Sequence, residues 1–529
     1  MHAFFCKQKF LKSILGLIVF LGGISSLHAQ RHLKYDLILK GGLIIDGTGR
    51  EPYHDDIAIR NGKIVKIGHC SSRNAYKTIN VHGQWVVPGF IDILCQNDLW
   101  WSQNQQHYAL ERGVTSALTG NCGWSFTRVR FNLNRFTHEP MLLNIGTLIG
   151  QGTLRDQVLN LNKYQQPTPQ QIQLMKKYIR RALKAGAFGL SSGLAYQPGE
   201  WCRPQELVEE ASVLKAFPHA AYYTHIRNFH SQILSAVQEA IHVGQVDHIP
   251  VIVQHLLIKM PHNWNKAERV FLLFEKARSE GLPVYATIYP YDFWGNEVQL
   301  PLSQFLYFPD NVTSLNFYSN PRQYQLVLKK IQDQLQMYGG GKWIEVTRLS
   351  PDMPQNDLGK TISQLAQKWK MSDVRTVLAL LLKNKEQVGI CYHGLSRRNI
   401  QRSIQEPFML FGSDATRHMI DPRIVGAFPR LIAHYVRKDH MINLITLIHR
   451  LTEAPAHLMG LKHRGSIMVG NWADLVIFNY QKIHDQATPV HPLIPSQGIR
   501  FVLVNGQIAL HRNQIVSNCA GHVLRRSNH

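Results

Sequence analysis

Short apolar runs recur through the middle of the chain, with helical patterns between them. Each run is rich in β-branched or aromatic residues and is bounded by turn residues, which is typical of a strand buried on both faces. The segments between them carry apolar residues at helical spacing, for example over residues 169–185 and 204–216. This alternation predicts parallel strands with helices packed outside them. The predicted strands are residues 86–94, 115–123, 141–150, 187–194, 221–226, 250–256, 283–291 and 409–415.

Eight strands with intervening helices predict an α/β fold, a (β/α)8 barrel of the TIM type. One connection does not fit this repeat, because residues 292–408 are far longer than an ordinary loop. A helical pattern at 321–337 and a strand-like run at 343–346 lie inside it. We therefore expect an insertion at about residues 292–386, between strands seven and eight, which could act as a lid.

Both ends of the chain carry a different pattern, with short alternating strands and tight turns. Asn61-Gly62 lies between two alternating runs, which is a strong hairpin signal, and Asn505-Gly506 repeats it near the other end. We expect one small β-domain formed by both chain ends. The predicted division is a leader at 1–29, the β-domain at 30–85 and 465–529 with a basic tail, and the barrel at 86–464.

Residues 1–29 have the order of a secretory signal peptide. Three lysines precede an apolar run over residues 14–27, which is short for a membrane span. An uncleaved anchor stays open as an alternative, because Leu27 is a poor residue before a cleavage site. We expect an exported protein, periplasmic or secreted, with no stable membrane insertion after removal of the leader.

The formal net charge is +23, and three of these positive charges belong to leader lysines. Such an excess could indicate nucleic acid or an anionic membrane surface as partner. The basic residues are dispersed, however, with short clusters at 176–181 and at Arg525-Arg526, and no nucleic-acid motif accompanies them. We interpret them as solvated surface and expect no nucleic-acid partner. Seven cysteines are scattered without a CxxC pair, so the sequence assigns no disulfide pairing.

Two histidines lie at corresponding positions of neighbouring predicted strands. His225 ends the run Ala221-Tyr-Tyr-Thr-His225, and His255 ends the run Pro250-Val-Ile-Val-Gln-His255. The helical pattern between them makes a strand, helix, strand unit, whose strands must be parallel. Both side chains are therefore expected at the carboxyl ends of the strands, where the active sites of such barrels lie. A single histidine is more often structural, but two at the same height indicate a pair of metal ligands.

Cys122 and Asp414 join this pair at the predicted ends of strands two and eight. A thiolate and two imidazoles suit zinc and leave a fourth position open for water. A carboxylate beside that water can accept its proton and later return it. Taken singly, Cys122 could be a buried apolar residue and Asp414 a helix cap. Together with His225 and His255 they predict a hydrolytic metal site.

The chain resembles the N-acyl-D-amino-acid deacylase (D-aminoacylase) family of the amidohydrolase superfamily, over about residues 35–510. Each matching stretch is weak alone, and their common order makes the resemblance specific. The stretches are Val86-Val-Pro-Gly-Phe-Ile-Asp92, Gly113-Val-Thr, Gly120-Asn-Cys-Gly123, Gly189-Leu-Ser-Ser-Gly-Leu-Ala-Tyr-Gln-Pro198, Thr224-His-Ile-Arg227, Gln254-His-Leu256, Tyr289-Pro-Tyr291, Gly412-Ser-Asp414, Gly465-Ser-Ile467 and Ala473-Asp-Leu-Val476.

The resemblance implies roles for individual residues of the predicted site. It makes Cys122, His225 and His255 a tight zinc site, with the cysteine in place of a carboxylated lysine. It makes Asp414 the catalytic aspartate. An arginine is implied to grip the α-carboxylate of the substrate, for which a guanidinium is well suited, and two tyrosines are implied to lie nearby; these residues are Arg423, Tyr196 and Tyr289. The arginine could instead cap a helix or face solvent, and either tyrosine could pack at the rim.

The chain departs from the family at the end of the first barrel strand. The family ordinarily carries His-x-His there, as ligands of a second metal, whereas this chain has Leu94 and Gln96. Leucine cannot ligate and glutamine is a poor zinc ligand, so we expect one Zn2+ per chain. Thr287 stands where the family usually has an acid, and Asp421 where a histidine is common. Asp98 could be either a supporting residue of the site or a structural one.

The sequence thus predicts a zinc-dependent amidohydrolase that hydrolyses the amide bond of small N-acyl amino acids, with D-configured substrates favoured. A second hypothesis is a degenerate barrel that binds acylated amino acids or peptide fragments without turnover. A scaffold without chemistry does not need Asp414 together with all three ligands, which favours the enzyme. A basic nucleic-acid binder is the third hypothesis, and it would show steeply salt-dependent affinity.

Overall fold

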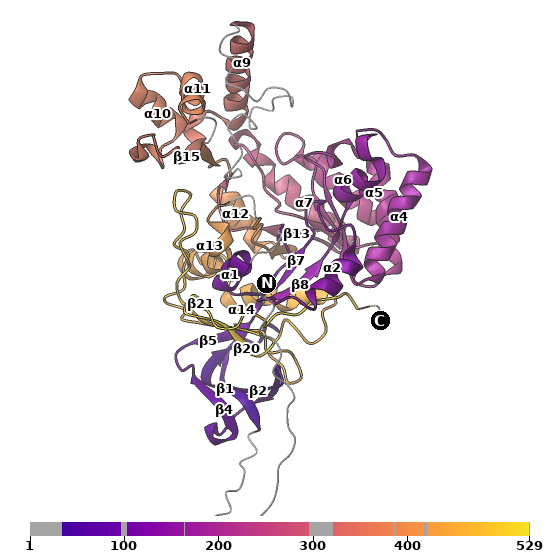
Figure 1. The fold of residues 1–529 in the computed structure, drawn as a ribbon, viewed down its shortest axis with the longest axis vertical. Helices are drawn as coiled ribbons and strands as arrows, with labels where there is room; N and C mark the ends of the chain where they lie inside the picture. Colours follow the sequence, from indigo (N-terminus) through magenta and orange to yellow (C-terminus); the bar gives the residue numbers. More distant parts are fainter. Residues whose placement is uncertain are drawn as a thin grey trace, which may run out of the picture.

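The computed structural model describes residues 34–96, 103–162, 164–295, 321–384, 388–416 and 420–527 (Figure 1). The predicted leader, Asp98 and part of the predicted insertion lie outside the described residues. Within the ranges described, no helix is both long enough and apolar enough to cross a bilayer. The barrel forms the middle of the molecule, with the β-domain at one end of the long axis and the insertion at the other (Figure 1).

The predicted (β/α)8 barrel is confirmed. Its strands are β6 (Phe90–Asp92), β7 (Val114–Thr119), β8 (Asn144–Thr147), β9 (Ile149–Gly150), β10 (Gly189–Gly193), β11 (Ala221–His225), β12 (Val251–Val253), β13 (Val284–Ile288) and β17 (Met409–Phe411). They form one sheet with the order β17-β13-β12-β11-β10-β9 and another with the order β6-β7-β8. Leu148 alone separates β8 from β9, so these two segments make one strand that joins the sheets.

The first and last barrel strands meet just beyond β6 and β17. Cys95 and Ala415 form a parallel bridge there. The amide of Asp414 donates to the Leu94 carbonyl at 2.8 Å, and the amide of Gln96 donates to the Ala415 carbonyl at 2.8 Å. These bonds close the ring of strands at their carboxyl ends. We call this contact the seam.

Helices cover the outside of the barrel. The predicted helix at 169–185 begins at a capping box formed by Thr168 and Gln171, with proline at its first position. The helix predicted at 204–216 is α-helical only to Ala211 and continues as a 3-10 turn (Ser212–Ala216). The helices are α1 (Gln103–Glu111), α2 (Val129–Phe136), α3 (Gln151–Leu159), α4 (Pro169–Lys184), α5 (Pro204–Ala211), α6 (Ile233–Asp247), α7 (Ala267–Ser279), α12 (Arg397–Gln405), α13 (Arg423–Arg430), α14 (Leu444–Leu451) and α15 (Glu453–Leu458).

The strand predicted at residues 86–94 is two strands in the structure. β5 (Trp85–Pro88) belongs to the sheet of the β-domain, whereas β6 belongs to the barrel. Gly89 separates them, and its amide donates to the Asp474 carbonyl at 2.8 Å. A Cβ at Gly89 would lie 2.1 Å from Oγ1 of Thr115. Glycine therefore lets the chain pass closely from one sheet into the other.

Both chain ends build one sheet. Its strands are β1 (Tyr35–Ile44), β2 (Tyr53–Arg60), β3 (Lys63–Ile67), β4 (Ala75–Asn80), β5, β18 (Leu475–Phe478), β19 (Ile499–Val504), β20 (Gln507–His511) and β21 (Gln514–Ile515). The order is β21-β20-β19-β18-β5-β1-β2-β3, with β4 beside β1. The antiparallel pair of β18 and β5 joins the C-terminal strands to the N-terminal ones.

The insertion leaves the barrel after β13 and returns before α12. Its described part contains α9 (Pro321–Tyr338), α10 (Ile362–Trp369), α11 (Asp373–Lys383), and a sheet of β14 (Trp294–Gly295), β16 (Gly389–Tyr392) and β15 (Ile344–Arg348) in that order. It follows the carboxyl end of a barrel strand, so it lies at the end of the barrel where active sites are built. The Met260 amide donates to the Gly394 carbonyl at 3.0 Å and ties the two parts together.

The basic tail contains a buried arginine, whereas the sequence predicts its charges to lie on a solvated surface. Arg526 is 2% exposed, and its guanidinium donates to the carbonyls of Leu183 and Ala187 at 3.0 and 3.2 Å. Val523 also bridges to Ile145 in the barrel. The charge is tolerated inside because several carbonyl oxygens accept from the guanidinium. The end of the chain is therefore packed on the barrel.

A buried ion pair supports the seam. Asp92 has no exposed surface and accepts from Arg112 Nη2 and from the Ser413 amide, both at 3.0 Å. We expect Asp92→Ala to lower the free energy of unfolding by about 3–5 kcal/mol, because Arg112 would stay buried without its counter-ion. Urea unfolding followed by circular dichroism measures the loss.

Glu139→Ala is the matched control. Glu139 pairs with Arg135 at 3.1 Å, but the two side chains are 46% and 42% exposed. Removing this surface pair should cost at most about 1 kcal/mol. Equal losses for the two variants would contradict a supporting role for Asp92.

Candidate metal centre and active site

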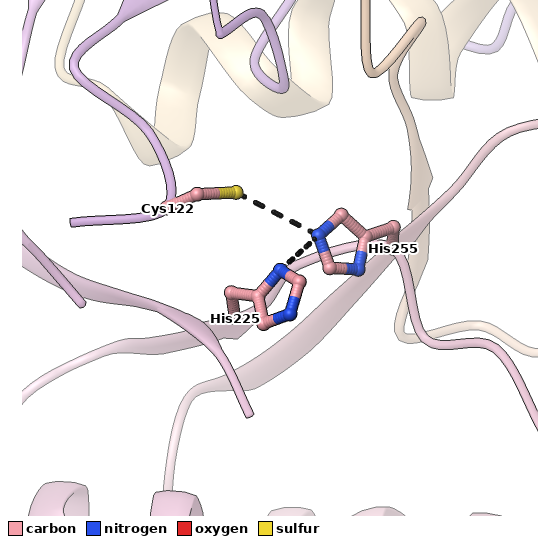
Figure 2. Close-up of side chains that lie close together, drawn as sticks. All are labelled: Cys122, His225 and His255. Atoms are coloured by element: carbon pink, nitrogen blue, oxygen red, sulfur yellow. Dashed lines mark hydrogen bonds between the residues drawn. The ribbon is translucent and has the colours of Figure 1, made fainter. Parts of the chain in front are cut away.

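The three predicted metal ligands meet in one cluster (Figure 2). Cys122 follows β7, His225 ends β11 and His255 follows β12. Nε2 of His255 lies 2.8 Å from Nδ1 of His225 and 3.6 Å from Sγ of Cys122. All three donor atoms lie within 4.8 Å of one another, and no second cluster of this kind occurs in the described part of the chain. The site lies at the carboxyl ends of neighbouring barrel strands.

The spacing of these atoms fits a zinc ion. Tetrahedral zinc, with bonds of about 2.3 Å to sulfur and about 2.0–2.1 Å to nitrogen, separates its ligand atoms by about 3.3–3.6 Å. The sulfur–nitrogen distance of 3.6 Å matches this range. The nitrogen–nitrogen distance of 2.8 Å would widen by about 0.5 Å around the ion. A thiolate with two imidazoles is also a donor set that zinc prefers, and it leaves a fourth position open.

The surroundings keep both histidines neutral, which is the form that ligates a metal. Burial lowers the pKa of His255 to about 4, and the Lys259 ammonium acts in the same direction. Burial, followed by the charges of His255 and Lys259, holds the pKa of His225 well below its usual range. Both imidazoles therefore present a lone pair at neutral pH.

The backbone is strained at three residues of the site. The φ angle is +55° at Cys122, +33° at His255 and +52° at Asp414. Residues with a side chain rarely adopt such angles, which cost on the order of 1–3 kcal/mol each and cluster at functional sites. All three lie just beyond the end of a barrel strand. Three of the fourteen described non-glycine residues with positive φ thus belong to the predicted metal and catalytic positions.

Hydrogen bonds from neighbouring strands fix the ligands. Gln254 Oε1 accepts from the Cys122 amide at 3.0 Å, and the Tyr196 hydroxyl donates to the Cys122 carbonyl at 2.5 Å. Thr287 Oγ1 accepts from the His255 amide at 2.9 Å. The ring of Tyr196 also packs edge-on against His225, with centroids 4.9 Å apart. The structure therefore places Tyr196 as a support for the loop of Cys122 as well as a wall of the site.

Asp414 lies beside the metal ligands and is held on both oxygens. Its Oδ1 accepts from Gln96 Nε2 at 2.5 Å, and its Oδ2 pairs with Arg423. Arg423 is 3% exposed and also contacts Asp421 at 2.7 Å. Its guanidinium lies 4.5 Å from the ring centroid of Tyr289. The arginine is therefore a buried cation between two carboxylates.

Gln96 connects the two parts of the predicted site. Its Nε2 lies 3.2 Å from Sγ of Cys122 and 2.5 Å from Oδ1 of Asp414. The seven residues predicted from the sequence thus form one connected cluster. One part holds the three metal ligands with Tyr196, and the other holds Asp414, Arg423 and Tyr289.

The chain is similar to known amidohydrolases and deacylases. A sequence model of the amidohydrolase family matches residues 403–510. N-acyl-D-glutamate deacylase of Alcaligenes xylosoxydans xylosoxydans is 28% identical over 519 residues, which cover 93% of this chain and 97% of that protein. The crystal structure of N-acyl-D-glutamate deacylase from Bordetella bronchiseptica, complexed with zinc and a phosphonate inhibitor, is 26% identical, with a TM-score of 0.77 and coverage of 93% of this chain and 100% of that one.

A structure of D-aminoacylase gives a TM-score of 0.76 at 26% identity, with the same coverage of the two chains. That enzyme has a binuclear metal centre, with one-metal activation and second-metal attenuation. Over nearly its whole length the chain is thus similar to N-acyl-D-glutamate deacylase and to D-aminoacylase. The match extends over nearly all described residues, so it includes the barrel, the β-domain and the site.

Local packing accommodates the positions at which the chain departs from the D-aminoacylase family. Leu94 has no exposed surface, and a Cβ added at Gly412 would lie 2.4 Å from the Cβ of Leu94. Thr287 accepts a hydrogen bond from the backbone amide of His255, and Asp421 accepts one from the Arg423 amide at 2.9 Å. These residues therefore have structural partners that suit their own chemistry.

Sequence reasoning missed Lys259 as a residue of the site. Its Nζ lies 5.0 Å from the ring centroid of Phe229 and 4.9 Å from that of Trp294, the first residue of β14. Phe229 in turn packs against His255, with centroids 5.2 Å apart. Burial lowers the pKa of Lys259 to about 8, against the opposing effect of the Asp414 carboxylate. The one available signal was its place in the sequence, four residues after His255.

Replacement of Cys122 tests the metal centre. We expect Cys122→Ser to lose most of its zinc, because a neutral hydroxyl is a far weaker ligand than a thiolate. Loss of a ligand should weaken zinc binding by more than the roughly 10–100-fold typical of supporting residues. Metal analysis after dialysis against a chelator measures this, and circular dichroism should show that the barrel persists.

Cys70→Ser is the matched control, since Cys70 is equally buried but donates to the Gly68 carbonyl in the β-domain. It should retain zinc as the wild type does. Wild-type zinc content in Cys122→Ser would remove the cysteine from the ligand set.

Proposed function

We propose that the protein is a zinc-dependent amidohydrolase that hydrolyses N-acyl-D-amino acids to a carboxylate and a free D-amino acid. One zinc per chain would be held by Cys122, His225 and His255. The observation that carries this proposal is the convergence of three zinc-type donor atoms with the buried carboxylate of Asp414 in one cluster. The similarity to N-acyl-D-glutamate deacylase and to D-aminoacylase supports the D configuration.

The chemistry of the site follows from its own residues. When bound, zinc supplies a Lewis acid that polarises the scissile carbonyl and favours deprotonation of water. Asp414 is the general base and then the general acid, because it is the carboxylate joined through Gln96 to the metal ligands. It accepts the proton of the attacking water and delivers it to the nitrogen of the departing amine. The water thereby supplies the hydroxyl of the new carboxyl group and the proton of the free amine, so no other co-reactant is needed.

Two cations are available to bind the carboxylate of the substrate. Arg423 suits this group chemically, but in the structure it already contacts two aspartates. Lys259 forms no hydrogen bond or ion pair with a carboxylate among the described residues, although it lies half-buried in an aromatic setting beside the site. A cation in such a setting gains much from an anionic partner. We place the substrate carboxylate between Lys259 and Arg423, with Tyr289 beneath the guanidinium.

The rival function is binding of acylated amino acids or peptide fragments without turnover. It would account for the absence of the His-x-His pair. It gives no reason for a carboxylate that is connected to a complete set of three ligands. A panel of N-acyl-D- and N-acyl-L-amino acids, assayed for release of free amino acid at known zinc content, tests the proposed function directly.

Asp414→Asn separates the enzyme from the binding protein. Asparagine preserves the shape of the side chain but cannot accept the proton. General acid–base catalysis typically contributes about 10²–10⁴ in rate, so we expect kcat to fall by that factor. Zinc content should stay at the wild-type level, because Asp414 is outside the three-ligand set. Turnover is measured at matched zinc content.

If the wild type and Asp414→Asn are equally inactive on every substrate while an acylated ligand still binds, the chain is a binding protein. Equal and substantial activity of the two would exclude Asp414 as the proton carrier. Thermal unfolding of both proteins controls for a loss of fold.

Lys259→Met tests the substrate carboxylate. We expect KM for N-acyl amino acids to rise by about 10–100-fold, because one charge-assisted pair is worth roughly 1.5–3 kcal/mol. Substrates whose carboxylate is blocked as an ester or amide should be poor substrates of the wild type. Lys259→Met should not raise KM for these blocked substrates any further. Lys259 carries its charge below its pKa of about 8, so KM of the wild type should rise as the pH rises through that value.

Lys266→Met is the control, since Lys266 is half-buried and donates to the Ser231 carbonyl at 2.9 Å and to Oδ1 of Asn263 at 2.6 Å. It should leave KM unchanged at every pH. A free and a blocked substrate that are turned over equally by the wild type would exclude a carboxylate subsite.

We also propose that the protein is exported, on the pattern of residues 1–29 alone. Fractionation of bacteria that produce the full-length chain should place a shortened protein outside the cytoplasm. A full-length protein held in the membrane fraction would instead support the uncleaved anchor.

A further inference from the structure

We propose that Gln96 holds the place of a second cation between the Cys122 thiolate and the Asp414 carboxylate. In this position it restricts the site to one metal and acts as a positioning residue for the general base. The inference rests on the proposed function, because it assigns a role to the absence of the His-x-His pair from this chain. Its central observation is one nitrogen, Nε2, in hydrogen-bond contact with both acceptors.

The seam places Gln96 beside Asp414. The Gln96 amide donates to the Ala415 carbonyl and the Asp414 amide donates to the Leu94 carbonyl, both at 2.8 Å. These backbone bonds set the register of two segments that are more than 300 residues apart in the sequence. The Gln96 side chain consequently leaves the backbone next to Asp414, and it is long enough to reach Cys122 on the next strand.

The chemistry of the partners fixes which end of the amide faces them. A ligating thiolate and an ionised carboxylate are acceptors only, so each requires a donor. The amide nitrogen of glutamine carries two hydrogens, one for each partner. The contacts of 3.2 Å to Sγ and 2.5 Å to Oδ1 use both of them. A side chain without charge therefore meets the needs of two anions.

Leu94 stands where the family carries the first histidine of the His-x-His pair. Its side chain has no exposed surface and packs against Gly412, where no room remains for a larger residue. A leucine offers no ligand atom. An ion that bridged Cys122 and Asp414 would therefore have to displace the Gln96 amide and would gain no protein ligand from the position of Leu94.

The same contact orients the general base. Oδ1 of Asp414 is held by Gln96, and Oδ2 is held by Arg423. Two donors on opposite oxygens fix the plane of a carboxylate, which is what a proton carrier needs in order to act at one point. Loss of the Gln96 donor should thus affect the chemical step more than substrate binding.

The experiment compares Gln96→Met and Gln96→Glu with a matched control, Gln401→Met. Methionine keeps the length of the side chain but removes both donors. Glutamate keeps the shape, removes the donors and adds an oxygen ligand for a metal. Gln401 is partly buried like Gln96 and also donates from Nε2 to an aspartate, Asp439, at 3.0 Å, but outside the site.

Metal counting is the first measurement, and it does not depend on turnover. We expect the wild type and Gln401→Met to hold about one zinc per chain after gel filtration, with activity that stays level in excess zinc. Gln96→Glu should bind a second zinc at least tenfold more tightly than the wild type does. With cobalt in place of zinc, the thiolate-to-cobalt absorption band should shift in Gln96→Met, because Sγ has lost a hydrogen bond, and should not shift in Gln401→Met.

The kinetic measurement separates positioning from packing. Gln96→Met should lower kcat by about 10–100-fold with KM changed less than threefold, at matched zinc content and with an unchanged melting temperature. Two tightly held zinc ions in the wild type would overturn the proposal, as would variants with wild-type metal binding, cobalt spectrum and kcat. If no acylated amino acid is turned over, the proposed function fails, but the zinc count and the cobalt spectrum still decide the role of Gln96.

Discussion

The structure depends on the pairing of the first barrel strand with the last. The Cys95–Ala415 bridge and the two flanking backbone bonds bring the ends of β6 and β17 together. Asp92 lies beneath this contact and bonds the backbone of both strands, at Leu94 and Ser413. Without this pairing of the strands, Asp414 would not face the candidate metal ligands, which come from other strands. One set of backbone hydrogen bonds therefore creates the active site as well as the closed barrel.

Much of the fold and the ligand set could be predicted from the sequence because their determinants are local. Apolar runs mark the strands, and parallel strands bring their carboxyl ends to one edge whatever the tertiary details. Cys122, His225 and His255 could therefore be placed together from their positions in the runs. The prediction of a single strand over 86–94 was wrong. A continuous run of apolar residues does not reveal where the chain passes from one sheet into another.

The rest could not be predicted because it depends on side chains that are distant in the sequence. The contact of Gln96 with Asp414, the enclosure of Arg423 by two aspartates and the approach of Lys259 are set by packing across the barrel. The burial of Arg526 has the same origin, since its partners are carbonyls at the end of α4 and in the segment that leads into β10. Charge in a sequence indicates solvent exposure only on average.

Arg423 has a structural task that affects how its function can be studied. It lies between Asp414 and Asp421, so its removal would leave two carboxylates buried together without a cation. Such a change is expected to cost several kcal/mol in stability, whatever Arg423 contributes to substrate binding. A loss of activity in an Arg423 variant would mix these effects, whereas removal of Lys259, which pairs with no carboxylate among the described residues, would leave no carboxylate buried without its cation.

The same electrostatic reasoning bears on whether the altered strand end marks a decayed enzyme. A thiolate and a carboxylate that face each other in a buried site repel, and each needs a donor or a cation. If the pair of histidines had simply been lost, an apolar residue at position 96 would have offered no donor to Oδ1 of Asp414 or to Sγ of Cys122. The chain has instead a neutral side chain with two hydrogens directed at the two acceptors. A scaffold that only bound its ligand would have no use for that arrangement, whereas a one-metal hydrolase requires its base to be held in place.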